Sequence, residues 1–169
     1  MTPLALVPGL TAEPVAVLID RLRERGETVA TAESLTAGLL TAVLTSVPGS
    51  SAVVRGGLVV YGADLKSSLA GVDAALLASN GPVDADVAVQ LAAGARERCR
   101  ASIGIGLTGV AGPDPQDGVR PGTVWVALIS ARGPSVALLT LSGDREEVRA
   151  GAVRGALDLL KADLDTLIE

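Results

Sequence analysis

The chain has 169 residues, a formal net charge of −5, a single cysteine and no histidine. This length fits one domain with a buried core, and a chain without histidine cannot form a Ser-His-Asp triad, a Cys-His dyad or a histidine-ligated metal site. No cluster of Lys or Arg marks a surface for nucleic acid or acidic membranes, and one cysteine cannot form an intramolecular disulfide, which favours a reducing cytoplasm.

The hydrophobic residues indicate a layered α/β fold. They make up 49% of the chain and are almost all Ala, Val and Leu; there is no Phe, and Tyr61 and Trp125 are the only aromatic residues. Such a core packs through β-branched strands and small helical residues. No apolar run reaches the ~18 residues that span a bilayer. The first residues lack the basic segment of a signal peptide.

The predicted elements follow one another without repeats or linkers. After an N-terminal segment at 1–12 that we expect to be flexible, the pattern predicts a helix at 13–25, a strand at 28–32, a helix at 36–46, a strand at 57–61, two short helices at 64–72 and 73–79, a long helix at 81–101, a strand at 101–109, a Pro/Gly/Asp loop at 111–122, a hairpin of strands at 123–130 and 135–141, and a helix at 143–168. Helices separate the early strands, and the late strands form a hairpin. This order predicts a mixed sheet with helices on both faces.

The first candidate site residue is Ser34, at the turn from a strand into a helix. In α/β sheets, ligands bind beyond the carboxyl ends of the strands. A serine nucleophile there can use the free N–H groups of the first helical turn, near Thr36, Ala37 and Gly38, as an oxyanion hole. The alternative is that Ser34 or Thr36 only caps the helix.

Tyr61 and Lys66 form the second candidate segment. Tyr61 ends a strand, and Lys66, one of only two lysines, lies about one turn into the next helix. Burial and a neighbouring cation can lower the pKa of such a pair until it serves as a base for Ser34. Glu33 is adjacent but faces the other side of the strand. The alternative is a half-buried tyrosine and a solvated lysine.

The third candidate segment is the glycine-containing stretch at 108–113. Thr108, Gly109, Ala111 and Gly112 allow backbone N–H groups to approach an anion such as phosphate; the alternative is an ordinary turn. The overlapping G-x-G-x-x-G at 104–109 is not a dinucleotide fingerprint, because a Pro-rich loop follows it rather than a helix.

Arg145 starts the last predicted helix, where its side chain and the helix N–H groups could receive a phosphate. The alternative is a helix cap with a surface arginine. Asp114, Asp117 and Asp144 match no metal motif, so we expect a solvated loop and no metal site.

Taken together, these segments resemble the C-terminal domain of the competence/damage-inducible protein CinA. The similarity covers about residues 15–160 and is carried by Thr31-Ala32-Glu33-Ser34, Pro-Gly-Ser-Ser at 48–51, Gly-x-x-x-Tyr-x-x-x-x-Lys ending at Lys66, Gly81-Pro82-Val83, the 108–113 stretch, Pro121-Gly122-Thr123-Val124 and Gly143-Asp144-Arg145. The family often has Glu-Ser-Cys-Thr-Gly-Gly; here Leu35 replaces the cysteine and Ala37 the first glycine. The family includes nicotinamide-nucleotide amidohydrolases, which convert nicotinamide mononucleotide (NMN) to nicotinate mononucleotide and ammonia.

The resemblance implies a three-layer α/β/α fold, a single domain over residues 1–169 and a site of Ser34, Tyr61 and Lys66. We therefore expect a cytoplasmic amide hydrolase of pyridine-nucleotide recycling. Ser34 attacks the carboxamide while Lys66 helps Tyr61 to carry the proton. The 108–112 loop and Arg145 hold the phosphate, and no cofactor or metal is required. The apolar terminal helices favour a homodimer. The alternative, suggested by Ala37, is a non-catalytic nucleotide-binding or interaction module of the same fold.

Overall fold

A mixed sheet of five strands forms the centre of the fold in the computed structural model, which describes residues 6–166. The strand order is β2-β1-β3-β4-β5. β1 (Val29–Glu33) pairs in parallel with β2 (Val54–Val59) and β3 (Ile103–Gly109), and β4 (Thr123–Ser130) and β5 (Gly133–Thr140) continue the sheet in antiparallel pairing. The predicted mixed sheet and the late hairpin are confirmed.

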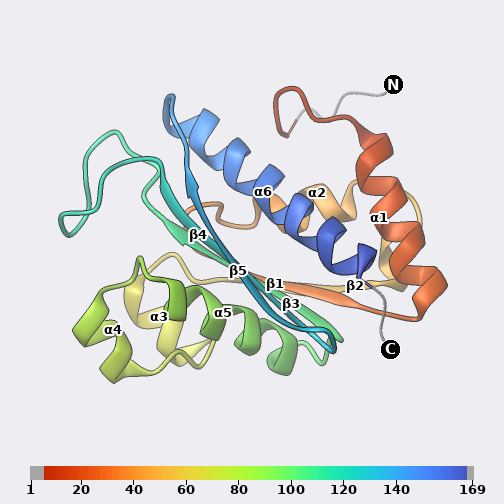
Figure 1. The fold of residues 1–169 in the computed structure, drawn as a ribbon, viewed down its shortest axis with the longest axis horizontal. Coiled ribbons are helices and arrows are strands. Elements are labelled where there is room, and N and C mark those ends of the chain that lie inside the picture. Colours follow the sequence, from red (N-terminus) through yellow and green to blue (C-terminus); the bar gives the residue numbers. More distant parts are fainter. Residues whose placement is uncertain (1–5, 167–169) are drawn as a thin grey trace.

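Helices cover both faces of this sheet, which gives three layers (Figure 1). One face carries α1 (Ala12–Arg25), α2 (Leu39–Thr45) and α6 (Arg145–Asp165), and the other carries α3 (Ala63–Ser68), α4 (Ala74–Asn80) and α5 (Ala85–Arg98). The expected α/β/α architecture is therefore confirmed. The N-terminal segment expected to be flexible lies partly outside the described residues; within them, Val7 is buried and packs on the core.

Several element boundaries differ from the sequence prediction, among them the start of α5 at Ala85 and not at 81, and two of the differences affect the site. α2 begins at Leu39, not at 36, because Ala37 and Gly38 have φ angles of 49° and 93° in the left-handed region. A helix cannot pass through such residues. β2 occupies Val54–Val59, so Tyr61 lies beyond the strand and not at its last position. The Ser34 turn (residues 34–38) is thus a non-helical connection between β1 and α2.

The glycines of β3 bring α5 unusually close to the sheet. A methyl group at Gly104 would overlap the carbonyl oxygen of Ala92, and one at Gly106 would overlap that of Ala88. Both carbonyls belong to α5, so the glycine spacing in β3 serves helix–sheet packing. This agrees with the expectation that the G-x-G-x-x-G pattern is not a nucleotide fingerprint.

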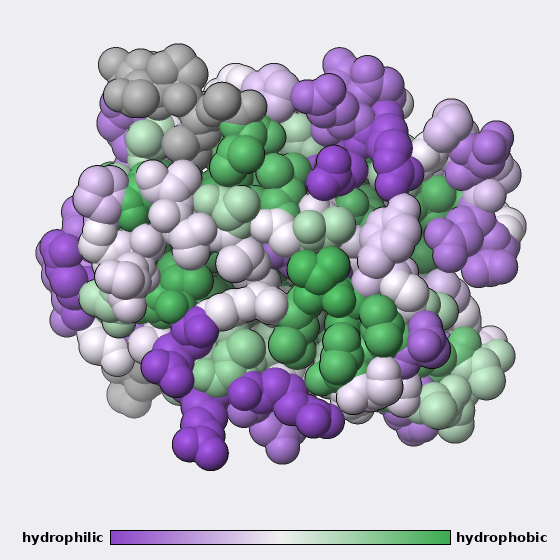
Figure 2. Space-filling model, turned by 180° about the vertical axis from the view of Figure 1, so that it is seen from behind, coloured by the Kyte–Doolittle hydropathy of each residue, from purple (hydrophilic) through white to green (hydrophobic). Residues whose placement is uncertain are grey.

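The surface mixes hydrophilic and hydrophobic residues. Figure 2, which views the molecule from behind, shows hydrophobic residues gathered near the middle of that face, with strongly hydrophilic ones around them. The large hydrophobic side chains that are about half exposed include Val59, Leu69, Val136 and Leu138. Among the described helices, none combines the length and the apolar character needed to cross a bilayer.

Candidate functional site

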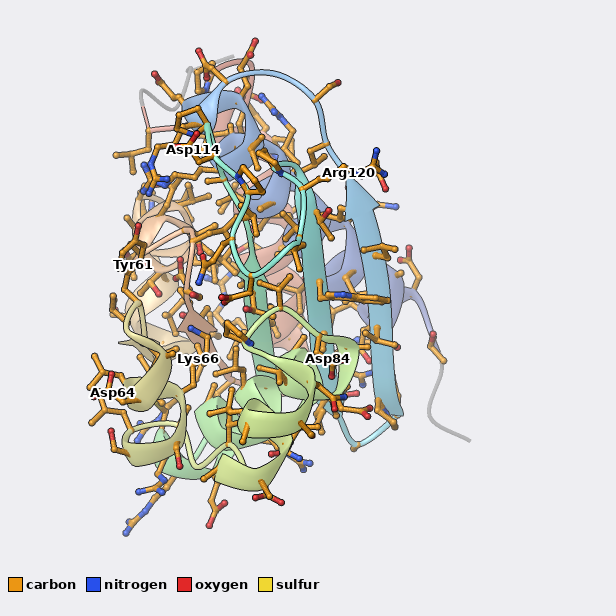
Figure 3. The ribbon with its side chains drawn as sticks, turned by 90° about the vertical axis from the view of Figure 1, so that its left-hand side faces the viewer. Tyr61, Asp64, Lys66, Asp84, Asp114 and Arg120 are labelled. Carbon is orange, nitrogen blue, oxygen red and sulfur yellow. The ribbon has the colours of Figure 1, made fainter. Side chains whose placement is uncertain are left out.

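A pocket opens at the carboxyl ends of the parallel strands, where the sequence predicted the site. Figure 3 faces this end of the sheet, with Tyr61, Lys66 and Asp114 lying around it. The pocket has a volume of about 180 Å³ and is lined by Ser34, Leu35, Tyr61, Ala63, Lys66, Pro82, Val83, residues 108–112, Asp114, Gln116 and Arg145. It therefore gathers all three candidate segments and Arg145, although they are far apart in the sequence.

Ser34 and Lys66 are in direct contact at the base of this pocket. The Nζ atom of Lys66 lies 2.9 Å from Ser34 Oγ and donates a second hydrogen bond of 3.1 Å to the carbonyl oxygen of Val60. Both side chains are buried, with 2% of Lys66 and 7% of Ser34 exposed. Burial lowers the pKa of Lys66 below its ordinary value, and the nearby Asp64 carboxylate partly opposes this effect. A lysine in these surroundings becomes a neutral amine more readily, and a neutral amine can accept the serine proton.

Tyr61 lies in the same pocket but does not stand between Lys66 and Ser34. Its side chain is 57% exposed, and its hydroxyl accepts a hydrogen bond of 2.9 Å from Nη2 of Arg145. The expected relay, in which Lys66 acts through Tyr61, does not match this geometry. The physical reason is the early end of β2: the Val60 carbonyl turns towards Lys66, and Tyr61 is carried outwards to the rim.

Glu33 organises the Ser34 turn, a role that the sequence analysis missed. Its carboxylate is fully buried and accepts hydrogen bonds from the backbone N–H groups of Gly38 (3.1 Å), Leu40 (3.0 Å) and Thr41 (2.8 Å). The hydroxyl of Thr41 donates a further bond of 2.7 Å. As expected from strand alternation, Glu33 faces the α2 side of the sheet, away from Lys66. The Glu33 carboxylate thus occupies the N–H groups at the start of α2, where the sequence predicted an oxyanion.

This arrangement corrects the expected oxyanion site at Thr36, Ala37 and Gly38. None of the three lines the pocket. The N–H of Gly38 donates to Glu33, and that of Ala37 donates to the Ser34 carbonyl over 3.0 Å. By contrast, Leu35 lines the pocket, and its N–H has no hydrogen-bond partner among the described residues. It is the N–H group of the turn best placed to meet a developing oxyanion.

The 108–112 segment and Arg145 form the opposite wall. Thr108 donates its hydroxyl proton to the Pro82 carbonyl over 2.5 Å, and the N–H groups of Ala111 and Gly112 have no partner in the described part of the chain. Arg145 donates from Nη1 to the Gly112 carbonyl over 2.9 Å. This wall therefore offers a guanidinium and free N–H donors, the groups that bind phosphate and carboxylate oxygens.

The first turn of α6 is not itself an anion site, contrary to expectation. The carboxylate of Asp144 accepts hydrogen bonds of 2.9 Å from the N–H groups of both Glu146 and Glu147. The side chain of Glu147 in turn accepts a bond from the Asp144 N–H, which completes a capping box. Only the Arg145 side chain reaches the pocket from this helix start.

A second arginine of α6, Arg149, was also missed. Its Nε donates to the Leu35 carbonyl and its Nη2 to the Thr36 carbonyl, each over 3.0 Å. Arg149 lies four residues after Arg145, so both project from one face of the helix. This i, i+4 spacing of arginines was the available sequence signal. Among the described residues, no group of three or more His, Cys, Asp or Glu side chains could hold a metal ion.

Comparisons with known proteins identify the family of the chain. Residues 12–164 match the family model described as the CinA C-terminal domain. A CinA-like protein of Frankia casuarinae is 45% identical over 145 residues, and a putative competence-damage inducible protein of Geobacillus kaustophilus is 43% identical over 150 residues. Each match covers 86% of this chain but only 34% and 36% of the relative. The chain thus spans about a third of the length of these curated relatives.

Solved structures show the same fold along nearly their whole length. The competence/damage inducible protein CihA of Agrobacterium tumefaciens superposes with a TM-score of 0.88 at 34% identity, covering 98% of this chain and 99% of that one. The competence damage-inducible protein A of Klebsiella pneumoniae superposes with a TM-score of 0.89 at 32% identity, covering 93% and 98%. From the family match, these identities and the shared fold, the chain belongs to the CinA C-terminal domain family.

Proposed function

We propose that this domain is an amide hydrolase that converts NMN to nicotinate mononucleotide and ammonia. The observation that carries the proposal is the 2.9 Å contact between Ser34 and a buried Lys66 whose pKa is lowered. A serine hydroxyl beside a neutral amine is the minimal pair for nucleophilic attack on an amide. Membership of a family that includes nicotinamide-nucleotide amidohydrolases supports the choice of substrate.

The reaction would proceed in two halves. Ser34 Oγ attacks the carboxamide carbon while the neutral Lys66 amine takes the hydroxyl proton. The oxyanion meets the N–H of Leu35, which no other described group occupies. As the C–N bond breaks, Lys66 returns the proton to the leaving nitrogen, and ammonia departs from an acyl-serine ester. A water molecule, deprotonated by the same amine, then attacks the ester carbon, and Lys66 returns that proton to Ser34 Oγ as the acyl–oxygen bond breaks and nicotinate mononucleotide leaves.

The opposite wall would hold the nucleotide phosphate. Arg145 supplies the charge, and the N–H groups of Ala111 and Gly112, which have no partner among residues 6–166, supply neutral donors. The pocket volume of about 180 Å³ is smaller than the ~300–1,000 Å³ of typical ligand pockets, so part of the nucleotide would lie along the rim. In this arrangement Tyr61 holds Arg145 through its hydroxyl and shapes the entrance.

The alternative of a non-catalytic module receives no support from Ala37. Its side chain is exposed on the turn and does not line the pocket, so its methyl group does not obstruct the reacting atoms. The homodimer and the cytoplasmic location stay predictions.

Replacing Ser34 with alanine tests the proposal directly. Ammonia release from NMN should fall by at least ~10³-fold in kcat, because the nucleophile is deleted. Ser50→Ala is the matched control, since Ser50 is also buried at 8% exposure but its hydroxyl bonds to the Thr45 carbonyl outside the pocket. Turnover of Ser34→Ala within about tenfold of wild type would remove Ser34 from this role.

A further inference from the structure

The Ser34 turn is held from two sides by charged side chains that the proposed reaction does not use. On one side, the buried Glu33 carboxylate accepts from the N–H groups of Gly38, Leu40 and Thr41. On the other, the Arg149 guanidinium donates to the carbonyls of Leu35 and Thr36. The Glu33 carboxylate thus binds N–H donors at and just after the end of the turn, and the Arg149 guanidinium binds carbonyl acceptors within it.

The bonds from Arg149 fix the peptide planes next to the reacting groups. The Leu35 N–H belongs to the peptide unit that joins Ser34 to Leu35. The Leu35 carbonyl belongs to the next peptide unit along the chain. Because the guanidinium is planar and donates from two nitrogens at once, it sets the orientation of two successive carbonyls. A point donor such as a lysine ammonium cannot reproduce that fork.

The turn depends on such support, because its backbone is not regular. Ala37 has a φ of 49°, in the left-handed region that L-residues disfavour. The N–H groups of the first turn of α2 bind the Glu33 carboxylate, so these groups are not available to a ligand. The side-chain bonds from Glu33 and Arg149 therefore add to the backbone bonds that hold Ser34. The Ser34 N–H donates to the Leu107 carbonyl over 3.1 Å, and the Ser34 carbonyl accepts from the Ala37 N–H over 3.0 Å.

We propose that Arg149 is a positioning residue, which holds the Ser34 turn so that the hydroxyl of Ser34 meets Lys66 and the N–H of Leu35 faces the pocket. The inference rests on the proposed role of Ser34 as nucleophile. Arg149 bonds only to the protein backbone and does not line the pocket. Its loss should therefore slow the chemical step and leave substrate binding nearly unchanged.

The test is kinetic and uses the full chain. In Arg149→Lys, kcat for ammonia release from NMN should fall about 10–100-fold, the usual effect of a displacement of about 1 Å, while KM changes less than roughly threefold. In Arg149→Ala, guanidinium ion at about 20 mM, far below denaturing concentrations, should restore part of the lost kcat. Urea at the same concentration should not.

Arg154 provides the matched control. It lies on the same helix, is half-buried like Arg149, and also donates to a backbone carbonyl, that of Pro8, but away from the pocket. Arg154→Lys and Arg154→Ala should keep the wild-type kcat, and guanidinium should not raise it. Thermal unfolding of every variant confirms that the compared proteins are folded.

A second readout separates this inference from the proposed function. A fluorophosphonate, whose phosphorus bonds to Ser34 Oγ as fluoride leaves and Lys66 takes the proton, should label wild type at Ser34. It should label Arg149→Lys more slowly, by the same factor as kcat. Equal labelling rates and equal kcat in Arg149→Lys and wild type would overturn the positioning role. So would an equal loss of kcat in the Arg154 variants. A wild type that is never labelled at Ser34, together with an active Ser34→Ala, would overturn the proposed function and this inference with it.

Discussion

Replacing Lys66 with methionine separates the contribution of the lysine amine to the reaction from that of the rest of the pocket. The substitution keeps an unbranched apolar stem and removes Nζ, the atom 2.9 Å from Ser34 Oγ and 3.1 Å from the Val60 carbonyl. A positioned general base contributes about 10²–10⁴-fold, so kcat for ammonia release from NMN should fall by that factor. KM should change little, because the phosphate would be held by the opposite wall.

The pH dependence gives the sharper signature. Burial lowers the pKa of Lys66, so in wild type kcat/KM should rise with pH through a value below the ~10.4 of an exposed lysine, as the amine becomes neutral. Methionine does not titrate. The residual activity of Lys66→Met should therefore lack this rise.

Stability should respond with a defined sign. Between the lowered pKa of Lys66 in the native state and the ordinary value in the unfolded chain, the unfolded chain binds more protons. The free energy of unfolding of wild type therefore rises with pH in that window, and the cost of burying the charge is fully present below it. Lys66→Met escapes this cost but loses two hydrogen bonds of about 0.5–1.5 kcal/mol each. Relative to wild type, the variant should lose stability as the pH rises towards ~10.4.

The assay is ammonia release and urea unfolding, both measured between about pH 6 and pH 10. The chain's other lysine supplies the control: Lys161 is 65% exposed on α6 and, among the described residues, pairs with Asp165 alone, so Lys161→Met should match wild type in both measurements. If Lys66→Met keeps kcat within about tenfold of wild type and shows the same pH profile, Lys66 is not the base.

Three further substitutions test the remaining parts of the pocket. Tyr61→Phe should raise KM for NMN by about 3–10-fold through the loosened Arg145, with kcat nearly unchanged; a kcat loss of about 10³-fold would instead return the proton relay to Tyr61. Arg145→Gln should raise KM for NMN by about 10–100-fold and hardly affect the dephosphorylated riboside, and equal harm to both substrates would exclude a phosphate contact. Ala37→Gly should raise the free energy of unfolding in urea by up to about 1 kcal/mol with kcat unchanged, because glycine adopts the left-handed backbone freely; a lower stability would contradict the strain at this residue.

Most of the fold could be predicted because local signals agreed with the final structure. Gly26, with a φ of 65°, ends α1 as expected, and Asp84 caps α5 through the N–H groups of Asp86 and Val87. The β4–β5 hairpin followed from two apolar runs around a short turn. The start of α2 could not be predicted, because a buried carboxylate from the preceding strand, and not helix propensity, decides where that helix begins.

The gathering of the site was predictable, but its internal contacts were not. Strand order brings Ser34, Lys66 and Thr108 to one end of the sheet, and that follows from parallel pairing. Which of Tyr61 and Lys66 touches Ser34 depends on how the chain leaves β2 after Val59, because one residue more or fewer of extended strand exchanges the inward and outward side chains. The side-chain partners of Glu33 and Arg149 lie on other elements, so spacing within their own segments could not reveal them.

The close packing of α5 on β3 connects residues outside the pocket to the position of the pocket wall. Pro82 and Val83, just before α5, form part of the pocket wall, and Thr108 at the end of β3 is tied to Pro82. Gly106 does not line the pocket. A side chain there would overlap the Ala88 carbonyl and push α5 away from the sheet. We therefore expect a bulkier residue at position 106 to shift Pro82 and Val83 and so to change the width of the pocket. Evolution or design could retune which substrates fit without altering a single group that touches them.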